Sequence, residues 1–528
     1  MKLTIVIGLL LAGLLLSHSA CTPSEGQTEP PPNIVLIMAD DMGFSDLGCY
    51  GSEIQTPNLD RLASEGMQMT QFYNTAKCTE TRATLLTGLH FQQSDNLYRS
   101  DNNVTIAEAL GEGGYQTIMS GKWHLGNWAE EVDTPNKRGF DEYFGFLCGA
   151  VNFFTGRDYG SDVNYMRLNN EVFEAPEDFY TTDAFTDYAI EQVSAATEQE
   201  SPFFLYLAHN APHFPLQVPE ENIAKYRSSY TIGWDSLRVQ RLQRMKELGI
   251  VDADQPLAPR DSLAPAWDVL DADQQQKEAE LMAVYAGMID RLDQQIGRLL
   301  NHLDSLEIAD NTLIVFLSDN GGCPFDANHS PILPPGPEES ARTYDTEWAQ
   351  ASNTPFRKYK QWIHEGGIAT PMIIRWPGKI QPDSKSEQPG QLVDIMPTFL
   401  AAARADYPDQ YPSRTVLPME GVSLLPAWQG EQLARKQPMF WEYRGSRAVR
   451  DGDWKLVAQR GGDWELYNMA EDRAELDNLI NQQPRRAETM LAAYEQWAER
   501  TGAISTEEAL AMPLNQQDRY FYEGEKEP

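Results

Sequence analysis

The stretch NIVLIMADD, residues 33–41, decides the fold class of this chain. Its first six residues form an apolar run, which is typical of a strand buried on both faces, and Asp40 and Asp41 come soon after it. Strands of this kind belong to mostly parallel sheets with helices on both faces. Such sheets bind ligands beyond the carboxyl ends of their strands, which is where Asp40 and Asp41 lie.

Similar apolar runs recur along the chain and alternate with helical patterns. The predicted strands are residues 115–120, 202–208, 312–318 and 371–376, and the predicted helices include 56–66, 280–306 and 393–403. The alternation predicts an α/β main domain over residues 33–430, with a large, mostly parallel or mixed sheet between helices. The polar stretch 215–278 is predicted to be an insertion at its rim.

The last part of the chain has a different character. Residues 436–515 contain MFWEY, SRAVRDGDWKLVA and DWELYNM, which are predicted short antiparallel strands, followed by a predicted helix over 485–501. The sequence therefore predicts a smaller C-terminal α+β domain built on an antiparallel sheet.

Charge limits the partners of the protein. The 528 residues include 42 Lys and Arg against 78 Asp and Glu, a formal net charge of −36. This balance argues against a nucleic-acid partner. A small anionic substrate stays compatible with it, because salt screens distant charges and a local basic pocket acts at short range.

The N-terminus has the features of an export signal. Residues 1–20 have a lysine, an apolar run and small residues, and Cys21 begins a stretch to residue 32 rich in Pro and Glu. We expect a signal peptide over 1–20, a disordered tether over 21–32 and a bacterial lipoprotein attached to a membrane through Cys21, in the periplasm or on the outer membrane. His18 departs from the usual lipoprotein pattern, so simple cleavage and a retained anchor remain alternatives.

Four further cysteines, Cys49, Cys78, Cys148 and Cys323, are scattered and show no zinc or disulfide spacing. Cys78 opens CTETRATLLTG, residues 78–88, a predicted helix whose N-terminal N–H groups favour an anion. Arg82 follows one turn later and can face the same ligand. When the segment is taken alone, a buried thiol ahead of a helix is the more common explanation of Cys78.

Oxygen ligands follow a second strand as well. Asp319 and Asn320 come directly after the run 312–318, as Asp40 and Asp41 follow the run 33–38. Three carboxylates and an amide oxygen at neighbouring strand ends suit a hard cation, Ca²⁺ or Mg²⁺. Caps or turns are the alternative, because aspartate favours such positions.

Basic side chains recur near the same strand ends, which is unusual in so acidic a protein. GKWHLG, residues 121–126, carries Lys122 and His124, which would point to one face of an extended segment. His213 follows the run 202–208, and Lys360 lies in PFRKYKQWIHEGG, residues 355–367.

These segments together carry a family resemblance. ADDMGFSDLGCYG, CTETRATLLTG, GYQTIMSGKWHLG, SDNGG and HEGGIATPMIIRWPG occur in this order. The chain resembles the type I, formylglycine-dependent sulfatases of the alkaline phosphatase superfamily, in their arylsulfatase-like branch. The resemblance runs from Asn33 through WELYNMAEDRAELDNL, residues 464–479.

The resemblance implies an alkaline phosphatase-like fold and hydrolysis of aryl or carbohydrate sulfate monoesters to alcohol or phenol and inorganic sulfate. It implies that a formylglycine-generating maturation enzyme converts Cys78 to formylglycine. One Ca²⁺, or Mg²⁺, would be bound by residue 78 and the four oxygen ligands, Asp40, Asp41, Asp319 and Asn320.

The resemblance also implies roles for the basic residues. Arg82 would orient the formylglycine hydrate, and Lys122 and Lys360 would hold the sulfate oxygens. His124 would assist collapse of the hydrate, and His213 would protonate the leaving alcohol. His364 and Lys358 would stand outside this first layer.

One residue departs from the family pattern. Glu80 stands two positions after Cys78, where Pro or Ala is usual, and a charge there can slow conversion of the cysteine. Two alternatives therefore stay open. One is a maturation-defective carbohydrate-binding relative, and the other is a phosphonate or phosphodiester hydrolase of the same superfamily.

Overall fold

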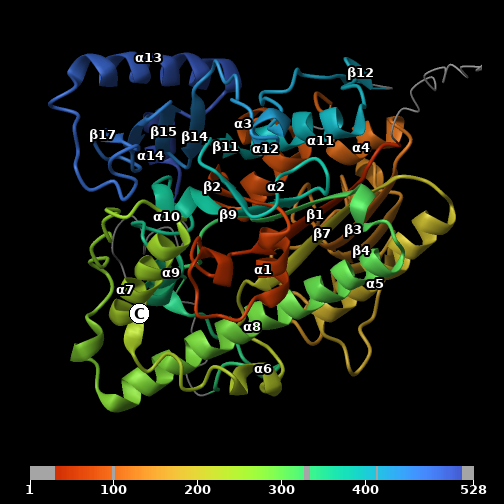
Figure 1. The fold of residues 1–528 in the computed structure, drawn as a ribbon, viewed down its shortest axis with the longest axis horizontal. Helices are drawn as coiled ribbons and strands as arrows, with labels where there is room; N and C mark the ends of the chain where they lie inside the picture. Colours follow the sequence, from red (N-terminus) through yellow and green to blue (C-terminus); the bar gives the residue numbers. More distant parts are fainter. Residues whose placement is uncertain (1–29, 98–100, 326–332, 412–413, 514–528) are drawn as a thin grey trace, which may run out of the picture.

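A single mixed sheet organises the larger part of the molecule in this computed structural model, which describes residues 30–97, 101–325, 333–411 and 414–513. Within these residues the sheet has eleven strands: β1 Asn33–Asp40, β2 Met67–Tyr73, β3 Gln116–Lys122, β4 Glu142–Phe146, β5 Met166–Leu168, β6 Glu171–Val172, β7 Phe203–Pro212, β8 Thr312–Ser318, β9 Ala369–Arg375, β10 Ser384–Ser386 and β11 Gly390–Gln391. Their order is β10-β2-β9-β8-β1-β7-β3-β4-β5-β6, with β11 also beside β2 (Figure 1).

The centre of the sheet is parallel. β1 lies between β8 and β7 and runs parallel to both, and β3 and β4 continue in the same direction. β9 is antiparallel to β8 and to β2, so the sheet is mixed toward that edge. The predicted α/β class with a mostly parallel or mixed sheet is confirmed.

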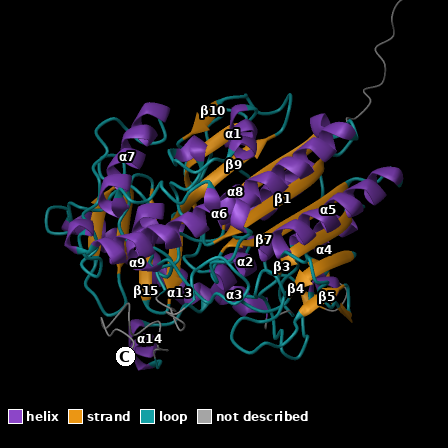
Figure 2. Cartoon of the chain, turned by 90° about the horizontal axis from the view of Figure 1, so that it is seen from below, coloured by secondary structure: helices purple, strands orange, loops and turns teal. Residues whose placement is uncertain are grey.

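Helices cover both faces of this sheet. α1 Pro57–Ser64, α5 Thr181–Glu198 and α8 Ala272–Ser305 lie on one face (Figure 2), and α2 Cys78–Thr87, α4 Ile106–Glu112 and α11 Ile395–Ala403 pack on the other. Alternate residues of β1 serve the two cores: Val35 and Ile37 belong to the first, and Ile34 and Leu36 to the second. Because alternate residues face two different cores, the strand is apolar at every position from Ile34 to Ala39.

Helix α8 is longer than the predicted helix over 280–306. It begins at Ala272 because the Asp271 side chain accepts a hydrogen bond from the Gln274 backbone, and the Gln274 side chain accepts one from the Asp271 backbone. This reciprocal cap starts a first turn that is almost entirely polar. Apolar periodicity could not detect such a turn.

The polar stretch 215–278 contributes to the first core. It forms α6 Glu220–Ala224 and α7 Gly233–Leu248, and Trp234 packs edge-on against Trp348 with ring centroids 5.3 Å apart. Arg241 of α7 is fully buried and pairs with Asp46 at 2.7 Å and with Glu53 at 2.8 Å. Buried aromatic and paired charged residues thus fix a segment whose composition resembles a surface loop.

The C-terminal part forms a second sheet at one end of the molecule (Figure 1). Its four strands are β14 Met439–Tyr443, β15 Ser446–Asp451, β16 Trp454–Ala458 and β17 Glu465–Asn468, all antiparallel. α13 Pro484–Thr501 covers one face through Tyr494 and Trp497. The remaining elements include α3 Phe91–Ser94, α9 Asp345–Ser352, α10 Glu365–Ile368, α12 Leu425–Trp428, α14 Thr506–Ala511 and the pair β12 Gln410–Tyr411 and β13 Arg414–Thr415.

A buried charge network joins the two sheets. Lys455 of β16 contacts Glu365 of α10 at 2.9 Å and Glu475 at 2.8 Å, and all three residues are fully buried. The Glu475 carboxylate also accepts a hydrogen bond from the Glu365 backbone, and Tyr73 of β2 donates one to the Glu365 carboxylate. The segment that leads into α10 is thereby attached to the C-terminal sheet.

The expected signal peptide and Cys21 lie outside the described residues, as does most of the expected tether. At the end of that tether, Pro32 is buried, and its carbonyl accepts a hydrogen bond from Tyr115 at 2.8 Å. Ordered chain therefore begins before residue 33. Among the helices of the described ranges, none combines the length and apolar character needed to cross a bilayer.

The Lys455→Met substitution should destabilise the protein strongly, because it removes the cation that the buried Glu365 and Glu475 share; Arg473 stays 3.3 Å from Glu365. We expect the free energy of unfolding to fall by roughly 3–5 kcal/mol in denaturant titrations. The matched control is Lys385→Met, at an exposed position of β10, for which the change should stay within about 0.5 kcal/mol. Equal stability of the two variants would contradict this role.

His90 should make the stability of the fold depend on pH. It is buried against Trp497 of α13, with ring centroids 5.0 Å apart, and burial lowers its pKa from 6.5 to about 4 even with Glu420 nearby. The unfolded chain therefore takes up a proton at His90 below pH 6.5, whereas the folded chain does so only near pH 4.

The sign of this effect is a loss of stability on acidification. Between pH 7 and pH 5, protonation of His90 in the unfolded chain should lower the free energy of unfolding by about 2 kcal/mol. The His90→Gln variant should lose that part of the pH dependence, and a His302→Gln variant, at a half-buried position, should keep most of it. An unchanged pH dependence in the His90→Gln variant would contradict the assignment.

Candidate active site

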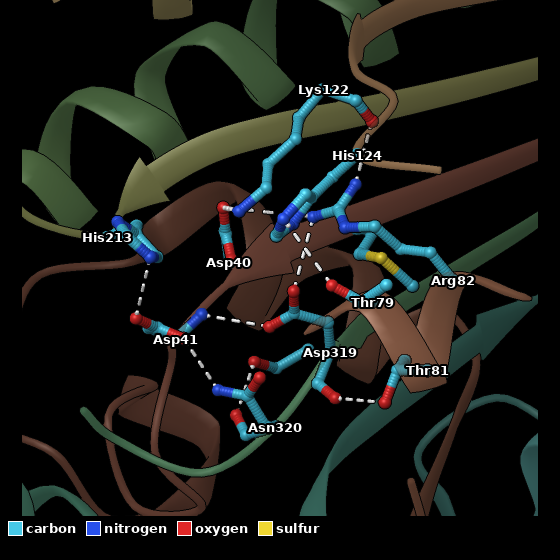
Figure 3. Close-up of polar contacts among 12 residues, drawn as sticks. Asp40, Asp41, Thr79, Thr81, Arg82, Lys122, His124, His213, Asp319 and Asn320 are labelled. Carbon is cyan, nitrogen blue, oxygen red and sulfur yellow. Dashed lines mark hydrogen bonds and ion pairs between the residues drawn. The ribbon is translucent and has the colours of Figure 1, made fainter. Parts of the chain in front are cut away.

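Four polar residues converge where β1 and β8 end. Ala39 and Ser318 are register partners in the two parallel strands, so the residues that follow them emerge side by side. The Asp41 backbone donates a hydrogen bond to Asp319 Oδ1 at 3.0 Å, and Asn320 Nδ2 donates one to Asp41 Oδ1 at 2.6 Å. Figure 3 shows the carboxylates of Asp40, Asp41 and Asp319 turned toward one another.

Two backbone features allow this convergence. Asp41 adopts a left-handed conformation, with φ of 69°, which aspartate tolerates better than most residues. A Cβ atom added to Gly321 would lie 2.0 Å from the Gly366 carbonyl oxygen, so only glycine lets these two segments meet. Their contact places Lys360 beside the end of β8, where its backbone donates to the Gly322 carbonyl at 3.1 Å.

Helix α2 brings a nucleophile position and a permanent cation to the same place. Cys78 is its first residue, and the possible ligand atoms of Asp40, Cys78 and Asp319 all lie within 4.8 Å of one another. Arg82, one turn later and fully buried, lies 3.2 Å from Asp319 Oδ2 and donates to the Lys122 carbonyl at 2.8 Å.

Sequence reasoning missed Thr81. Its hydroxyl donates a hydrogen bond to the Asp319 carbonyl at 2.6 Å and so attaches α2 to the end of β8. Its spacing of three residues from Cys78 places both on one helix face, and this spacing was the available signal.

The buried acids of the site are matched by buried bases. Lys122 Nζ lies 2.5 Å from Asp40 Oδ2, and Lys360 Nζ lies 2.6 Å from Asp41 Oδ1. With Arg82 on Asp319, each of the three carboxylates has a cationic partner. Charges buried to this degree are stable only when they are paired in this way.

The pKa values of Asp40 and Asp319 are shifted in opposite directions. Burial acts to raise the pKa of Asp40, but Lys122, His213 and Arg82 outweigh it and hold that pKa well below its usual range. Burial and the neighbouring Asp40 carboxylate raise the pKa of Asp319 well above its usual range. Asp40 and Asp319 therefore lie close enough to repel each other, and a cation between them would relieve this repulsion.

One histidine, His213, faces the carboxylates. His213 Nδ1 lies 2.6 Å from the Phe214 carbonyl oxygen, which can only accept, so this nitrogen carries the proton in the neutral ring. Nε2 of the neutral ring then presents a lone pair to Asp41 Oδ2 at 3.3 Å. Burial lowers the pKa of His213 to about 4, although Asp41 opposes the shift. Two electron-pair donors facing each other need a proton or a cation near them.

His124 reaches the site differently from the prediction. β3 ends at Lys122, and His124 has a left-handed backbone with φ of 55°, so the extended segment predicted for both residues was wrong. His124 Nε2 lies 3.4 Å from the Thr79 hydroxyl, and burial together with Lys122 and Arg82 lowers its pKa well below the ordinary value. The ring faces the first turn of α2 (Figure 3).

The other basic residues near these motifs have separate partners. His364 Nε2 lies 3.2 Å from Glu465 of the C-terminal sheet, and Lys358 Nζ lies 2.8 Å from Asp261. Both are outside the carboxylate cluster.

The donor set of the cluster suits a divalent cation. Asp40 Oδ1 and Asn320 Oδ1 are buried and have no hydrogen-bond partner among the described residues, and Asp41 Oδ2 faces only the His213 nitrogen there. Buried oxygens left unpaired are costly unless a ligand satisfies them. Oxygen donors of this type are those that Ca²⁺ and Mg²⁺ prefer.

Comparisons with known proteins identify the family of the chain. The sequence profile of the Sulfatase family matches residues 32–405. A second profile, N-sulphoglucosamine sulphohydrolase, C-terminal, matches residues 356–498 and so includes the C-terminal sheet.

Individual relatives match most of the chain. An uncharacterized sulfatase of Schizosaccharomyces pombe is 34% identical over 90% of this chain and 94% of its own length. An arylsulfatase of Klebsiella aerogenes is 35% identical over 74% of this chain and 91% of its own length. Among solved structures, Ps i-CgsB in complex with k-i-k-neocarrahexaose is 28% identical, with a TM-score of 0.66. The match covers 89% of this chain and 93% of the Ps i-CgsB chain. This chain belongs to the sulfatase family and is an arylsulfatase-like sulfuric ester hydrolase.

Proposed function

We propose that this sulfatase cleaves sulfate monoesters of sugars or phenols with a formylglycine derived from Cys78 and one calcium ion. The observation that carries the proposal is the position of Cys78. It opens α2 within 4.8 Å of the Asp40 and Asp319 ligand atoms, with Arg82 buried beside it.

The proposed ion would be held by oxygens of Asp40, Asp41, Asp319 and Asn320 together with the oxidised side chain of residue 78. A hydrated formylglycine supplies a nucleophilic hydroxyl, and a divalent cation lowers the pKa of such a group and polarises the sulfate oxygens. Mg²⁺ would fit the same donor types, but the crowding of carboxylates favours the larger ion.

Charge balance explains how so acidic a protein would bind an anion. In the described site, three carboxylates face three cations, Arg82, Lys122 and Lys360. A divalent cation added to this balanced set leaves the pocket positive and attracts a sulfate ester. The global charge of −36 acts at longer range, where salt screens it.

The remaining residues act on the ester itself in this proposal. Lys122 and Lys360 stabilise negative charge that grows on the sulfate oxygens in the transition state, which is where binding accelerates a reaction. His213, once protonated at Nε2 beside the bound sulfate anion, donates that proton to the leaving oxygen. His124 removes a proton from the residue 78 hydrate as it collapses. Arg82 holds that hydrate in position against Asp319.

A glycan substrate and an exported protein are further parts of the proposal. The predicted signal peptide and Cys21 anchor would place the enzyme outside the cytoplasm, where sulfated polysaccharides occur. Ps i-CgsB, a relative by structure, is known in complex with k-i-k-neocarrahexaose. Both observations favour a carbohydrate sulfate over a small aryl sulfate as the natural substrate.

Purified protein co-expressed with a formylglycine-generating enzyme should release inorganic sulfate from 4-nitrophenyl sulfate and from sulfated sugars. The Cys78→Ala variant should lose at least about 1,000-fold in kcat, because the nucleophile is gone. The matched control, Cys49→Ala, removes a half-buried cysteine outside the site and should keep its activity.

Three outcomes would replace the proposal. Higher kcat/KM on bis(4-nitrophenyl) phosphate or a phosphonate ester than on any sulfate ester would favour the phosphonate or phosphodiester hydrolase. An unmodified Cys78 thiol in protein from the native host, measured by peptide mass spectrometry together with absent turnover, would favour a maturation-defective carbohydrate-binding relative. If protein in which Cys78 is fully converted to formylglycine hydrolysed none of these esters, all the enzymatic proposals would be contradicted.

Calcium should stabilise the fold through the same carboxylates. Chelator-treated protein should gain about 2.7 kcal/mol of unfolding free energy at a Ca²⁺ concentration 100 times the dissociation constant. The Asp319→Asn variant should lose this gain, because the proposed site then lacks one of its carboxylates. An undiminished calcium effect in that variant would contradict the assigned site.

A further inference from the structure

A pocket of about 490 Å³ lies between the first turn of α2 and the C-terminal sheet. Its wall is formed on one side by Glu80 of α2 and Phe91 of α3. On the other side it is formed by Glu442 and Tyr443 of β14, by Arg444 and by Ile504. The pocket therefore reaches the helix that carries the nucleophile position and extends over the C-terminal subdomain.

Glu80 links the pocket to the active site. It is the third residue of α2, and its carboxylate interacts electrostatically with Lys77, Cys78 and Arg444. Its Oε2 atom is buried and has no hydrogen-bond partner within the described chain. An acceptor in this state needs a donor, which a bound ligand can supply.

The rest of the wall indicates what kind of ligand fits. Phe91, Tyr443 and Ile504 offer apolar surface, while Glu80 and Glu442 offer carboxylate oxygens. Glu442 is held in place by Gln92 at 3.0 Å and by the Gly445 backbone at 2.9 Å. Apolar surface combined with a few fixed acceptors suits a molecule with C–H faces and a rim of hydroxyl groups, that is, a sugar.

Other ligands fit less well. A second sulfate group would meet the carboxylates of Glu80 and Glu442, while Arg460 of the wall already donates to the Arg444 and Met512 carbonyls. A flat hydrocarbon would leave Glu80 Oε2 without a donor. The volume also exceeds what a small phenol needs, since pockets of about 300–1,000 Å³ hold whole drug-sized ligands.

We propose that this pocket binds the sugar part of a glycosyl sulfate, with Glu80 accepting hydrogen bonds from its hydroxyl groups. The inference rests on the proposed hydrolysis of sulfate esters. It also gives a reason for a glutamate at a position where Pro or Ala is usual in the family: Glu80 would determine specificity for the alcohol part of the ester.

The test compares sugar sulfates with a small aryl sulfate. Glu80→Ala should lower kcat/KM for galactose 6-sulfate and glucose 6-sulfate, whichever the wild type prefers, by about 10- to 100-fold. The same variant should change kcat/KM for 4-nitrophenyl sulfate by no more than about threefold. Because Glu80 lies in the segment recognised during maturation, rates are divided by the formylglycine content of each preparation, measured by peptide mass spectrometry.

A second variant avoids the maturation segment altogether. Ile504→Trp fills the pocket from the C-terminal side and should give the same selective loss on sugar sulfates. The matched control for Glu80 is Glu488→Ala, an exposed glutamate of α13, which should behave as the wild type on both substrate classes. Equal losses on sugar and aryl sulfates, or no loss on either, in both pocket variants would overturn the inference.

A binding measurement separates this inference from the proposed function. Calorimetric titration of the two sugar sulfates into Cys78→Ala protein needs no turnover. Weaker binding in the Cys78→Ala/Glu80→Ala double variant would support the pocket even if no ester were hydrolysed. Identical affinities in the single and double variants would overturn it even in an active sulfatase.

Discussion

The parallel pairing of β1 with β8 is the constraint on which the rest of the structure depends. It brings two pairs of polar residues to one point, and three of the four side chains are carboxylates buried from solvent. Buried like charges at this distance are unstable without compensation. Lys122, Lys360 and Arg82 compensate this repulsion in the structure, and the proposed divalent ion would compensate it further.

The cations that compensate the buried carboxylates come from distant parts of the chain. Lys122 arrives at the end of β3, Arg82 from α2, and Lys360 from the segment before α10. That last segment is attached in turn to the C-terminal sheet through Lys455 and Glu365. The C-terminal subdomain thus supports the site mechanically, and in the proposed pocket it also contacts the substrate.

Much of the fold and of the candidate site could be predicted from local patterns. The apolar runs identified the central strands, because period-two alternation with both faces buried leaves no polar position. Asp40 and Asp319 were found because they follow such runs, and Cys78 with Arg82 because four residues make one helical turn. In each case the signal lies within a few consecutive residues.

The features that were missed depend either on pairing across long separations or on local polar and backbone details that apolar periodicity does not register. Arg241 is buried only because Asp46 and Glu53, almost 200 positions away, surround it, and nothing near it in sequence indicates this. The start of α8 was missed because its first turn is polar and relies on a cap. The left-handed backbone of His124 follows from where β3 ends, which alternation alone does not determine.

The most direct measurement is a calorimetric titration of Ca²⁺ into chelator-treated protein, repeated with an Asp40→Asn/Asp319→Asn double variant. We expect one ion to bind per chain of the wild type, and we expect no binding at the same concentrations when both strand ends have lost a carboxylate. Absence of binding to the wild type, or equal binding to both proteins, would contradict the central claim that β1 and β8 together form a divalent-cation site.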